Sequence, residues 1–328
     1  MKRIIFAICT ILCANVLWAQ EQLAVLKHND STSVFYGASA FIQAYNAATH
    51  GDIITLSDGI FTTPSYIRKG ITVRGNGACA DTARKSFGTY FMERFHIYYL
   101  GDSLQFSAEG IYFEDFNTTN SWDIKLTRCY IDGFNQEGGV QATNCIIRNY
   151  LHGTSNRNNT YINCALVSLN TTLPLLPYYV TCNNCIIFGA RDDNSGTIYG
   201  RFQYNNCIII KNNSTSNDTI LGGIINNSVL IGFTGANHIA SSGNVVMNFS
   251  DVFENWDGRR LYPDLETYVL KSSVSDSIQG IDGTEVGIFG GFMPFDWRPS
   301  YSIIKRFNVA NRTTADGKLS VDIEVISE

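Results

Sequence analysis

The stretch Asn184-Cys185-Ile186-Ile187 decides the fold, because the chain repeats it at a nearly regular spacing. The other copies are Asn144-Cys145-Ile146-Ile147, Asn163-Cys164-Ala165-Leu166, Asn206-Cys207-Ile208-Ile209 and Asn227-Ser228-Val229-Leu230. The register extends upstream to Ile111 and Cys129 and downstream to Val245, so successive key positions lie 16 to 22 residues apart. A short repeat of this length is typical of a solenoid in which each repeat forms one coil.

Each copy has the alternation of a β-strand, and no repeat shows a helical period. Stacking the coils predicts an interior ladder of cysteines at the key position and a second, apolar ladder two residues later. The Asn before each strand suits a sharp turn, because Asn tolerates a left-handed backbone. We expect this Asn column to include residue 244 as its last member.

The residue after each key position is expected to face outward. This stripe consists of Tyr112, Tyr130, Ile146, Ala165, Ile186, Ile208, Val229 and Val246. Monomers rarely leave so long an apolar stripe in water. We expect the tail (291–328) or the loop 169–179 to cover it, and a homotrimer is the alternative if it stays uncovered.

These repeats resemble the right-handed parallel β-helix proteins of the pectate-lyase-like superfamily, of the secreted bacterial type. The resemblance covers residues 34–290 and implies an all-β right-handed parallel β-helix. It also implies a short capping helix near residues 38–48, and residues 291–328 read as a C-terminal hairpin that lies on the coil or closes its C-terminal end. The superfamily contains lyases, hydrolases, esterases, adhesins and tailspikes, so the resemblance implies an architecture rather than an activity.

Residues 1–19 have the pattern of a signal peptide, with Lys2 and Arg3 before an apolar run that ends near Ala19. We therefore expect export to the periplasm, the cell surface or the medium, with no membrane span and no lipid anchor. Without Lys2 and Arg3 the basic residues number 22 against 29 acids, which makes nucleic acid a poor partner.

The chain has nine cysteines, of which Cys9 and Cys13 lie in the signal peptide. The repeat register favours core thiols over disulfides for most of the others. Cys182 and Cys185 have the spacing of a zinc or redox pair, but no second pair accompanies them. We therefore expect no metal and no cofactor.

Catalytic residues are not identified by any motif. Candidates for cleavage of a polysaccharide are Arg191, Asp192, Asp193, Arg201 and Lys211. Hydrolysis needs paired carboxyl groups, and a lyase of the related type would use a basic residue together with Ca²⁺. The sequence has neither a Gly-His-Gly segment nor an acidic calcium cluster beside these residues.

A polar, repetitive exterior is suited to lying along an extended polymer. We therefore expect a protein that binds a polysaccharide or cell-surface glycan, or has a structural role at the surface. Candidate glycan contacts are Trp122, Tyr178 and Tyr179, because aromatic rings in loops stack on sugars. A polysaccharide lyase or glycoside hydrolase is the first alternative, and an adhesin or assembly protein is the second.

Overall fold

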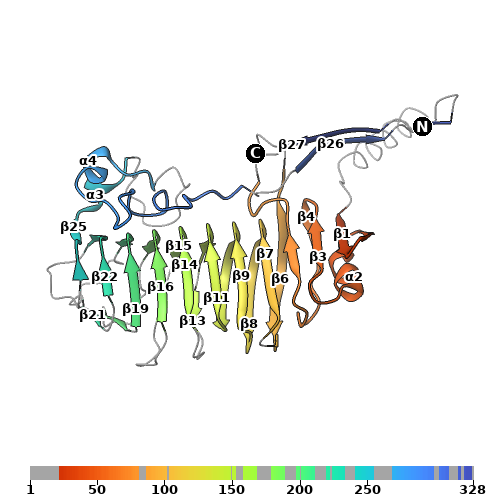
Figure 1. Cartoon of the computed structure of the whole chain (residues 1–328), viewed down its shortest axis with the longest axis horizontal. Coiled ribbons are helices and arrows are strands. Elements are labelled where there is room, and N and C mark those ends of the chain that lie inside the picture. The colour runs from red at the N-terminus through yellow and green to blue at the C-terminus, as the bar shows by residue number, and fades with distance from the viewer. Residues whose placement is uncertain are drawn as a thin grey trace, which may run out of the picture.

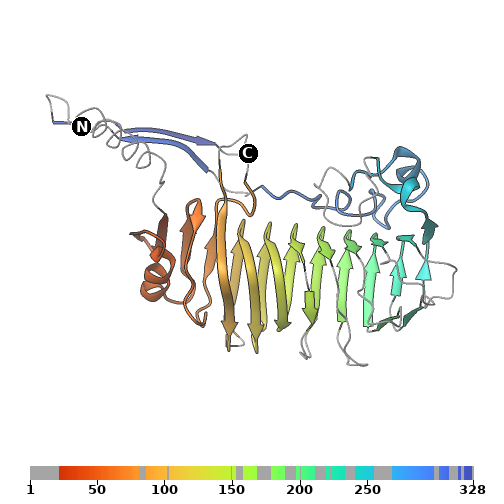
Figure 2. The same ribbon diagram turned by 180° about the vertical axis from the view of Figure 1, so that it is seen from behind.

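The chain forms a parallel β-helix, as the repeats predict. The structure is a computed structural model. It describes residues 22–80, 86–101, 103–148, 150–152, 158–167, 179–188, 197–199, 201–210, 219–221, 224–232, 241–254, 268–298, 303–309, 317–318 and 321–326. Figure 1 shows the strands stacked side by side along one axis, and Figure 2 shows the same row from behind. Among the described residues, helices are short and few.

Two long sheets make up the coils. In spatial order, the 12-stranded sheet contains β2 (Ser31–Tyr36), β1 (Leu23–His28), β3 (Ile53–Leu56), β5 (Thr72–Arg74), β7 (Gln105–Glu109), β9 (Asp123–Thr127), β11 (Val140–Thr143), β14 (Asn159–Ile162), β16 (Tyr179–Asn183), β19 (Arg201–Asn205), β22 (Ile224–Asn226) and β24 (Ser241–Ser242). From β3 onward its neighbouring strands are parallel.

The 11-stranded sheet holds the repeated motif. It contains β4 (Gly59–Ile60), β6 (Thr89–Tyr98), β8 (Tyr112–Thr119), β10 (Tyr130–Glu137), β12 (Ile146–Ile147), β15 (Ala165–Val167), β17 (Ile186–Phe188), β20 (Ile208–Ile210), β23 (Val229–Ile231), β25 (Val245–Met247) and β13 (Tyr150–His152), which pairs with β10. Two smaller sheets pair β18 (Thr197–Tyr199) with β21 (Thr219–Leu221) and β26 (Ile303–Val309) with β27 (Val321–Ile326).

A cap closes the N-terminal end of the coil. Helix α2 (Ala40–Ala47) buries Phe41, whose ring centroid lies 4.9 Å from that of Phe91 in the first coils. This confirms the predicted capping helix. The β1–β2 hairpin, which the sequence did not predict, pairs antiparallel with β3 and so ends the stack of parallel strands at this side.

The antiparallel C-terminal hairpin of β26 and β27 is confirmed as well. In Figure 1 it is drawn beside the N-terminal end of the solenoid, not at its C-terminal end. The last strands of the coil are β24 and β25. Val246 of β25 pairs with the inward-facing Leu230 but is 49% exposed. The C-terminal end is therefore less completely covered by the described residues than the N-terminal end is.

The interior ladders lie as predicted, with one correction. The key-position residues from Ile111 to Ser228 are buried, and so are the apolar residues two positions later. In the last coil, however, Val229 pairs with Val245, so Ser228 stacks on Asn244. The predicted register was one residue too late there, because Gly243 takes the left-handed turn that Asn takes in the earlier coils (φ 70°).

The cysteine ladder is held by hydrogen bonds that repeat from coil to coil. Each key-position thiol donates to the carbonyl oxygen two residues before it, at 3.2–3.3 Å. Ser228 donates in the same way at 2.8 Å. The backbone N–H of Cys145 in turn donates to Sγ of Cys164 at 3.4 Å, and the N–H of Ser228 donates to Oδ1 of Asn244 at 2.9 Å.

Cys, Ser and Asn therefore perform one task at this position, which is to satisfy the backbone groups at the bend. A thiol does so while remaining apolar enough for the core. Burial raises the pKa of Cys145 and Cys164 well above the ordinary value, so both stay protonated donors. All seven cysteines in the described residues are free.

Replacing one thiol tests this role. Cys164→Val keeps the size and apolar character but leaves the buried N–H of Cys145 without an acceptor, which costs about 1–3 kcal/mol. Cys164→Ser keeps both hydrogen bonds, as Ser228 does in its own coil. We expect the free energy of unfolding in urea to fall more for Val than for Ser. Equal or greater stability of the Val variant would show that the thiols act only as core filling.

Candidate functional site

A column of asparagines lies along one edge of the solenoid, at the sharp turn before each strand of the 11-stranded sheet. Its members, called here the turn column, are Asn144, Asn163, Asn184, Asn206 and Asn227. All five have a left-handed backbone, with φ between 46° and 56°. Asn adopts this conformation more easily than other residues with a side chain, as the sequence predicted. Arg128 holds the same conformation in the preceding coil.

The turn column binds a segment that comes from far along the chain. This segment, called here the strap (residues 279–296), follows α3 (Phe249–Val252) and α4 (Ser272–Ser275). In Figure 1 it is the blue chain that runs back along the upper edge of the solenoid. The contacts are Asn227 Nδ2 to Gln279 O (3.3 Å), Ile281 N to Asn206 Oδ1 (2.9 Å), Asn184 Nδ2 to Glu285 O (3.3 Å), Asn163 Nδ2 to Ile288 O and Gly290 O (2.8 and 2.7 Å) and Asn144 Nδ2 to Pro294 O (3.4 Å).

Two glycines are required by the path of the strap, Gly290 mainly by a tight turn within the strap and Gly287 by contact with the solenoid. A methyl group at Gly290 would lie 1.5 Å from the carbonyl oxygen of Glu285 and 2.9 Å from Nδ2 of Asn184. One at Gly287 would lie 2.7 Å from Cδ1 of Ile208, and the backbone there has φ 84°. Neither position accepts a side chain without moving the strap.

Charged groups near the ends of the strap are accommodated by local partners. Burial acts to raise the pKa of Asp296, but hydrogen bonds from Arg298 and the charge of Arg128 outweigh it and hold the pKa below its ordinary value. For Glu285, burial raises the pKa, and the hydrogen bond from Ser275 only partly opposes this.

Described residues between 249 and 297 cover part of the outward apolar stripe. Ile186, Ile208 and Val229 are fully buried in a second core, together with Val252, Phe253, Tyr268, Leu270, Val274, Ile278, Val286, Ile288 and Phe295. This part of the stripe is therefore covered within the chain, as expected, but mainly by residues that precede the predicted tail. Tyr112, Tyr130 and Ile146 are half-buried, and Val246 is 49% exposed. The condition under which we expected a trimer is not met over these coils. Most of the loop 169–179 lies outside the described residues.

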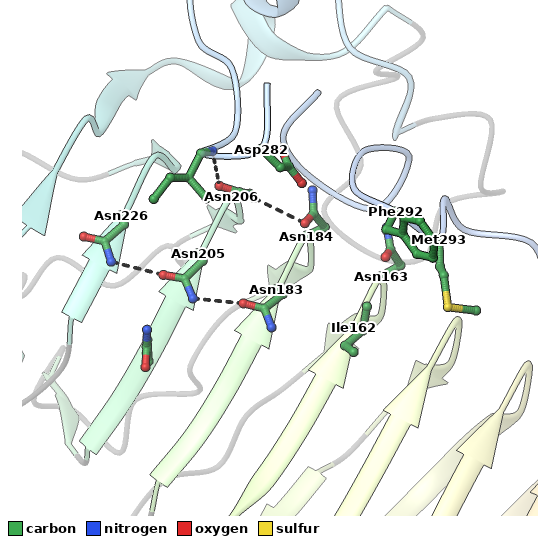
Figure 3. A pocket seen from close by; sticks show the side chains of 12 residues that line it. Ile162, Asn163, Asn183, Asn184, Asn205, Asn206, Asn226, Asp282, Phe292 and Met293 are labelled. Atoms are coloured by element: carbon green, nitrogen blue, oxygen red, sulfur yellow. Dashed lines mark hydrogen bonds between the residues drawn. The ribbon is translucent and has the colours of Figure 1, made fainter. Parts of the chain in front are cut away.

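A second row of amides lies one residue before the turn column, on the outer face of the 12-stranded sheet. In this outer amide ladder, Asn226 Nδ2 donates to Asn205 Oδ1 at 3.0 Å, and Asn205 Nδ2 donates to Asn183 Oδ1 at 2.9 Å. Figure 3 shows the ladder crossing three neighbouring strands. The hydrogen bonds fix the orientation of each amide, so the row is rigid along the solenoid axis.

The strap overhangs this ladder and forms a groove with it. The groove has a volume of about 480 Å³. It is lined by Ile162, Asn163, Asn183, Asn184, Gln203, Asn205, Asn206, Asn226, Ile281, Asp282, Phe292 and Met293. In Figure 3, Phe292 and Met293 lie at one end of the groove, above Asn163 and Ile162. Phe292 is 98% exposed, which is unusual for a side chain of this size.

Several polar atoms of the groove are left without a partner among the described residues. Oδ1 of Asn163 accepts no hydrogen bond although the residue is only 1% exposed. Nδ2 of Asn183, at the end of the outer amide ladder, has no acceptor in the described part of the chain, and the exposed Gln203 makes no side-chain hydrogen bond there. Buried amide oxygens are nearly always paired, but Oδ1 of Asn144, which does not line the groove, lacks a partner as well, so this feature belongs to the turn column and does not by itself mark a ligand site.

None of the predicted site residues is among the described lining residues of this groove. Arg191, Asp192, Asp193, Lys211 and Tyr178 lie outside the described residues. The backbones of Tyr179 and Arg201 pair with each other in β16 and β19, two residues before Thr181 and Gln203. Trp122 is half-buried just before β9, which is separated from the groove strand β14 by β11.

The sequence carried signals for the residues that were missed. The sequence identified the asparagines as turn residues but not as a binding surface. Asparagines that bind one another along a ladder have the same sequence pattern as asparagines that point into solvent. Phe292 follows Gly290-Gly291 and precedes Met293-Pro294. A large aromatic residue in such a turn-forming setting cannot be part of a strand ladder, and this setting marks it as a candidate for exposure.

The described residues hold no group of three or more His, Cys, Asp or Glu side chains placed to bind a metal. None of the helices in this part of the chain has the length and apolarity that crossing a membrane requires. Comparison with protein-family models gives no match, and comparison with curated proteins gives no significant match. The function is therefore inferred from the groove itself.

The contact between the strap and the turn column can be tested at Gly290. Gly290→Ala should displace the strap, lower the free energy of unfolding by about 2 kcal/mol and expose the apolar stripe. Increased fluorescence of the dye ANS would report that exposure. Gly283→Ala is the control, because a methyl group there meets open space and adds only backbone strain at φ 76°. Equal dye binding by both variants would mean that close approach at Gly290 does not hold the strap.

Proposed function

We propose that this chain is an exported glycan-binding protein and that the groove under the strap holds an extended saccharide. The observation that carries the proposal is the outer amide ladder, which presents oriented amides along the solenoid axis beside an exposed aromatic ring. Amides donate and accept hydrogen bonds, as sugar hydroxyls do, and an aromatic face suits the C–H face of a sugar ring. Export rests on the N-terminal signal pattern of residues 1–19.

Binding is favoured over cleavage at this groove. Asp282 is the one ionisable side chain among its described lining residues. Hydrolysis of a glycoside requires two carboxyl groups, and elimination from a uronate requires a base and a group that neutralises the carboxylate. The lyase and hydrolase alternatives would therefore need charged groups other than these described lining residues.

We infer in addition that the chain is a member of the pectate-lyase-like superfamily. The parallel coils, the internal ladders and the capping helix support this inference. An adhesin or assembly role was linked to a bare apolar stripe, and the burial of Ile186, Ile208 and Val229 removes that reason for it.

Affinity electrophoresis in gels that contain single polysaccharides tests the proposal. We expect the protein without its signal peptide to be retarded by at least one polysaccharide and to release neither unsaturated products nor new reducing ends. Phe292→Ala should weaken the retardation roughly fivefold, because loss of a stacking contact costs about 1 kcal/mol.

The matched control is Phe87→Ala, which removes a ring that is 66% exposed but does not line the groove. Its retardation should equal that of the unaltered protein. Retardation that Phe292→Ala leaves unchanged would move the binding site away from the groove. Release of unsaturated products or new reducing ends would favour the enzyme alternative. Absence of retardation by every polysaccharide tested would contradict glycan binding.

A further inference from the structure

The charge of the groove sets a condition on its ligand. Its described lining residues contribute seven amide side chains (Asn163, Asn183, Asn184, Gln203, Asn205, Asn206 and Asn226) and one carboxylate, Asp282, but no Lys, Arg or His. The whole chain has a formal net charge of −5 as well. An anionic ligand would lie next to Asp282 without a positive partner among the described lining residues, and like charges held close together repel.

The unpaired polar atoms set a second condition. Oδ1 of the buried Asn163 can only accept a hydrogen bond, whereas Nδ2 of Asn183 can only donate one. Oδ1 of Asn163 has almost no accessible surface, so a ligand in the groove can reach Nδ2 of Asn183 but not that oxygen. Hydroxyl groups donate and accept, and they suit a groove lined by amides. Acidic sugars keep hydroxyl groups as well, so the charge of the groove, and not its hydrogen-bonding pattern, separates neutral from acidic chains.

The repeat of the solenoid sets a third condition. Neighbouring strands lie about 4.8 Å apart, so the outer amide ladder offers one amide at each such step. This step is close to the length of one sugar residue in an extended chain. Phe292 and Met293 form an apolar surface at the end of the groove, beside Ile162. A ring with an uncharged C–H face fits that surface without loss of ion hydration.

We propose that the groove selects neutral, hydroxyl-bearing polysaccharides and rejects uronate-containing and sulfated ones. This inference rests on the proposed glycan-binding function and names its substrate class. Asp282 acts as a specificity-determining residue by repelling acidic chains. The amide ladder supplies the register along the chain, and Phe292 supplies the stacking contact.

The test compares gels that contain a neutral polysaccharide (mixed-linkage β-glucan, xylan or glucomannan) with gels that contain polygalacturonate or a sulfated galactan. The protein used is the full chain without its signal peptide. We expect retardation in at least one neutral gel, unchanged by added salt, and none in the acidic gels. Binding that falls with added salt would instead indicate an electrostatic contact.

A charge variant makes the test sharper. Gln203→Lys places a cation in the groove at an exposed residue that makes no side-chain hydrogen bond in the described part of the chain. The control Gln141→Lys adds the same charge at an equivalent place on the outer face of β11, away from the groove. We expect Gln203→Lys to gain at least threefold more retardation in polygalacturonate than Gln141→Lys. Equal gains by the two variants would show that the groove does not set the charge preference.

Three outcomes separate this inference from the function on which it rests. Retardation only in acidic gels would overturn the neutral class while leaving glycan binding intact. Retardation in neither kind of gel, with both variants folded by circular dichroism, would overturn the proposed function itself. Retardation in neutral gels that Asn183→Ala and Phe292→Ala both weaken, while Phe87→Ala does not, would support both.

Discussion

The left-handed turn that begins each strand of the 11-stranded sheet is the constraint on which the rest of the structure depends. A coil of this size closes only if the backbone reverses sharply between its two long sheets, and a left-handed residue accomplishes that in one step. Asn occupies five such turns in succession. Because these turns stack in register, the side chains that make them form a column on the outside and the residues after them form a column on the inside.

Both columns form hydrogen bonds with backbone groups, the inner one within the coils and the outer one with the strap. Inside, Cys, Ser and Asn satisfy backbone groups at the bend, so the core can be apolar without leaving a buried N–H unpaired. Outside, one amide of the turn column binds its neighbour, from Asn206 Nδ2 to Asn184 Oδ1, and the amides of the column also hold the backbone of the strap. The strap completes the second core over part of the apolar stripe and forms one side of the groove. The same row of turns therefore positions the core, the second core and the candidate site.

Much of the fold followed from residue patterns along the chain. The period of the Asn-Cys phrase predicted the coils, and alternation within it predicted which residues face inward, from Ile111 to Ser228. The error at Val245 arose where Gly243 replaced Asn as the turn residue, because the pattern was followed by residue type and not by backbone conformation. The β1–β2 hairpin was missed because its strands are short, pair locally and belong to no repeat.

The sequence by itself determined the solenoid, because each coil repeats the same turn residue and the same alternation of apolar residues. Stacking of the coils then brings equivalent residues together. Only the tertiary structure decided the candidate site. The turn column binds carbonyl oxygens of the strap, such as those of Gly290 and Pro294, across sequence separations of 52 to 150 residues. A carbonyl oxygen is the same at every position of every chain, so a contact made through the backbone leaves no pattern of residues from which it could be predicted.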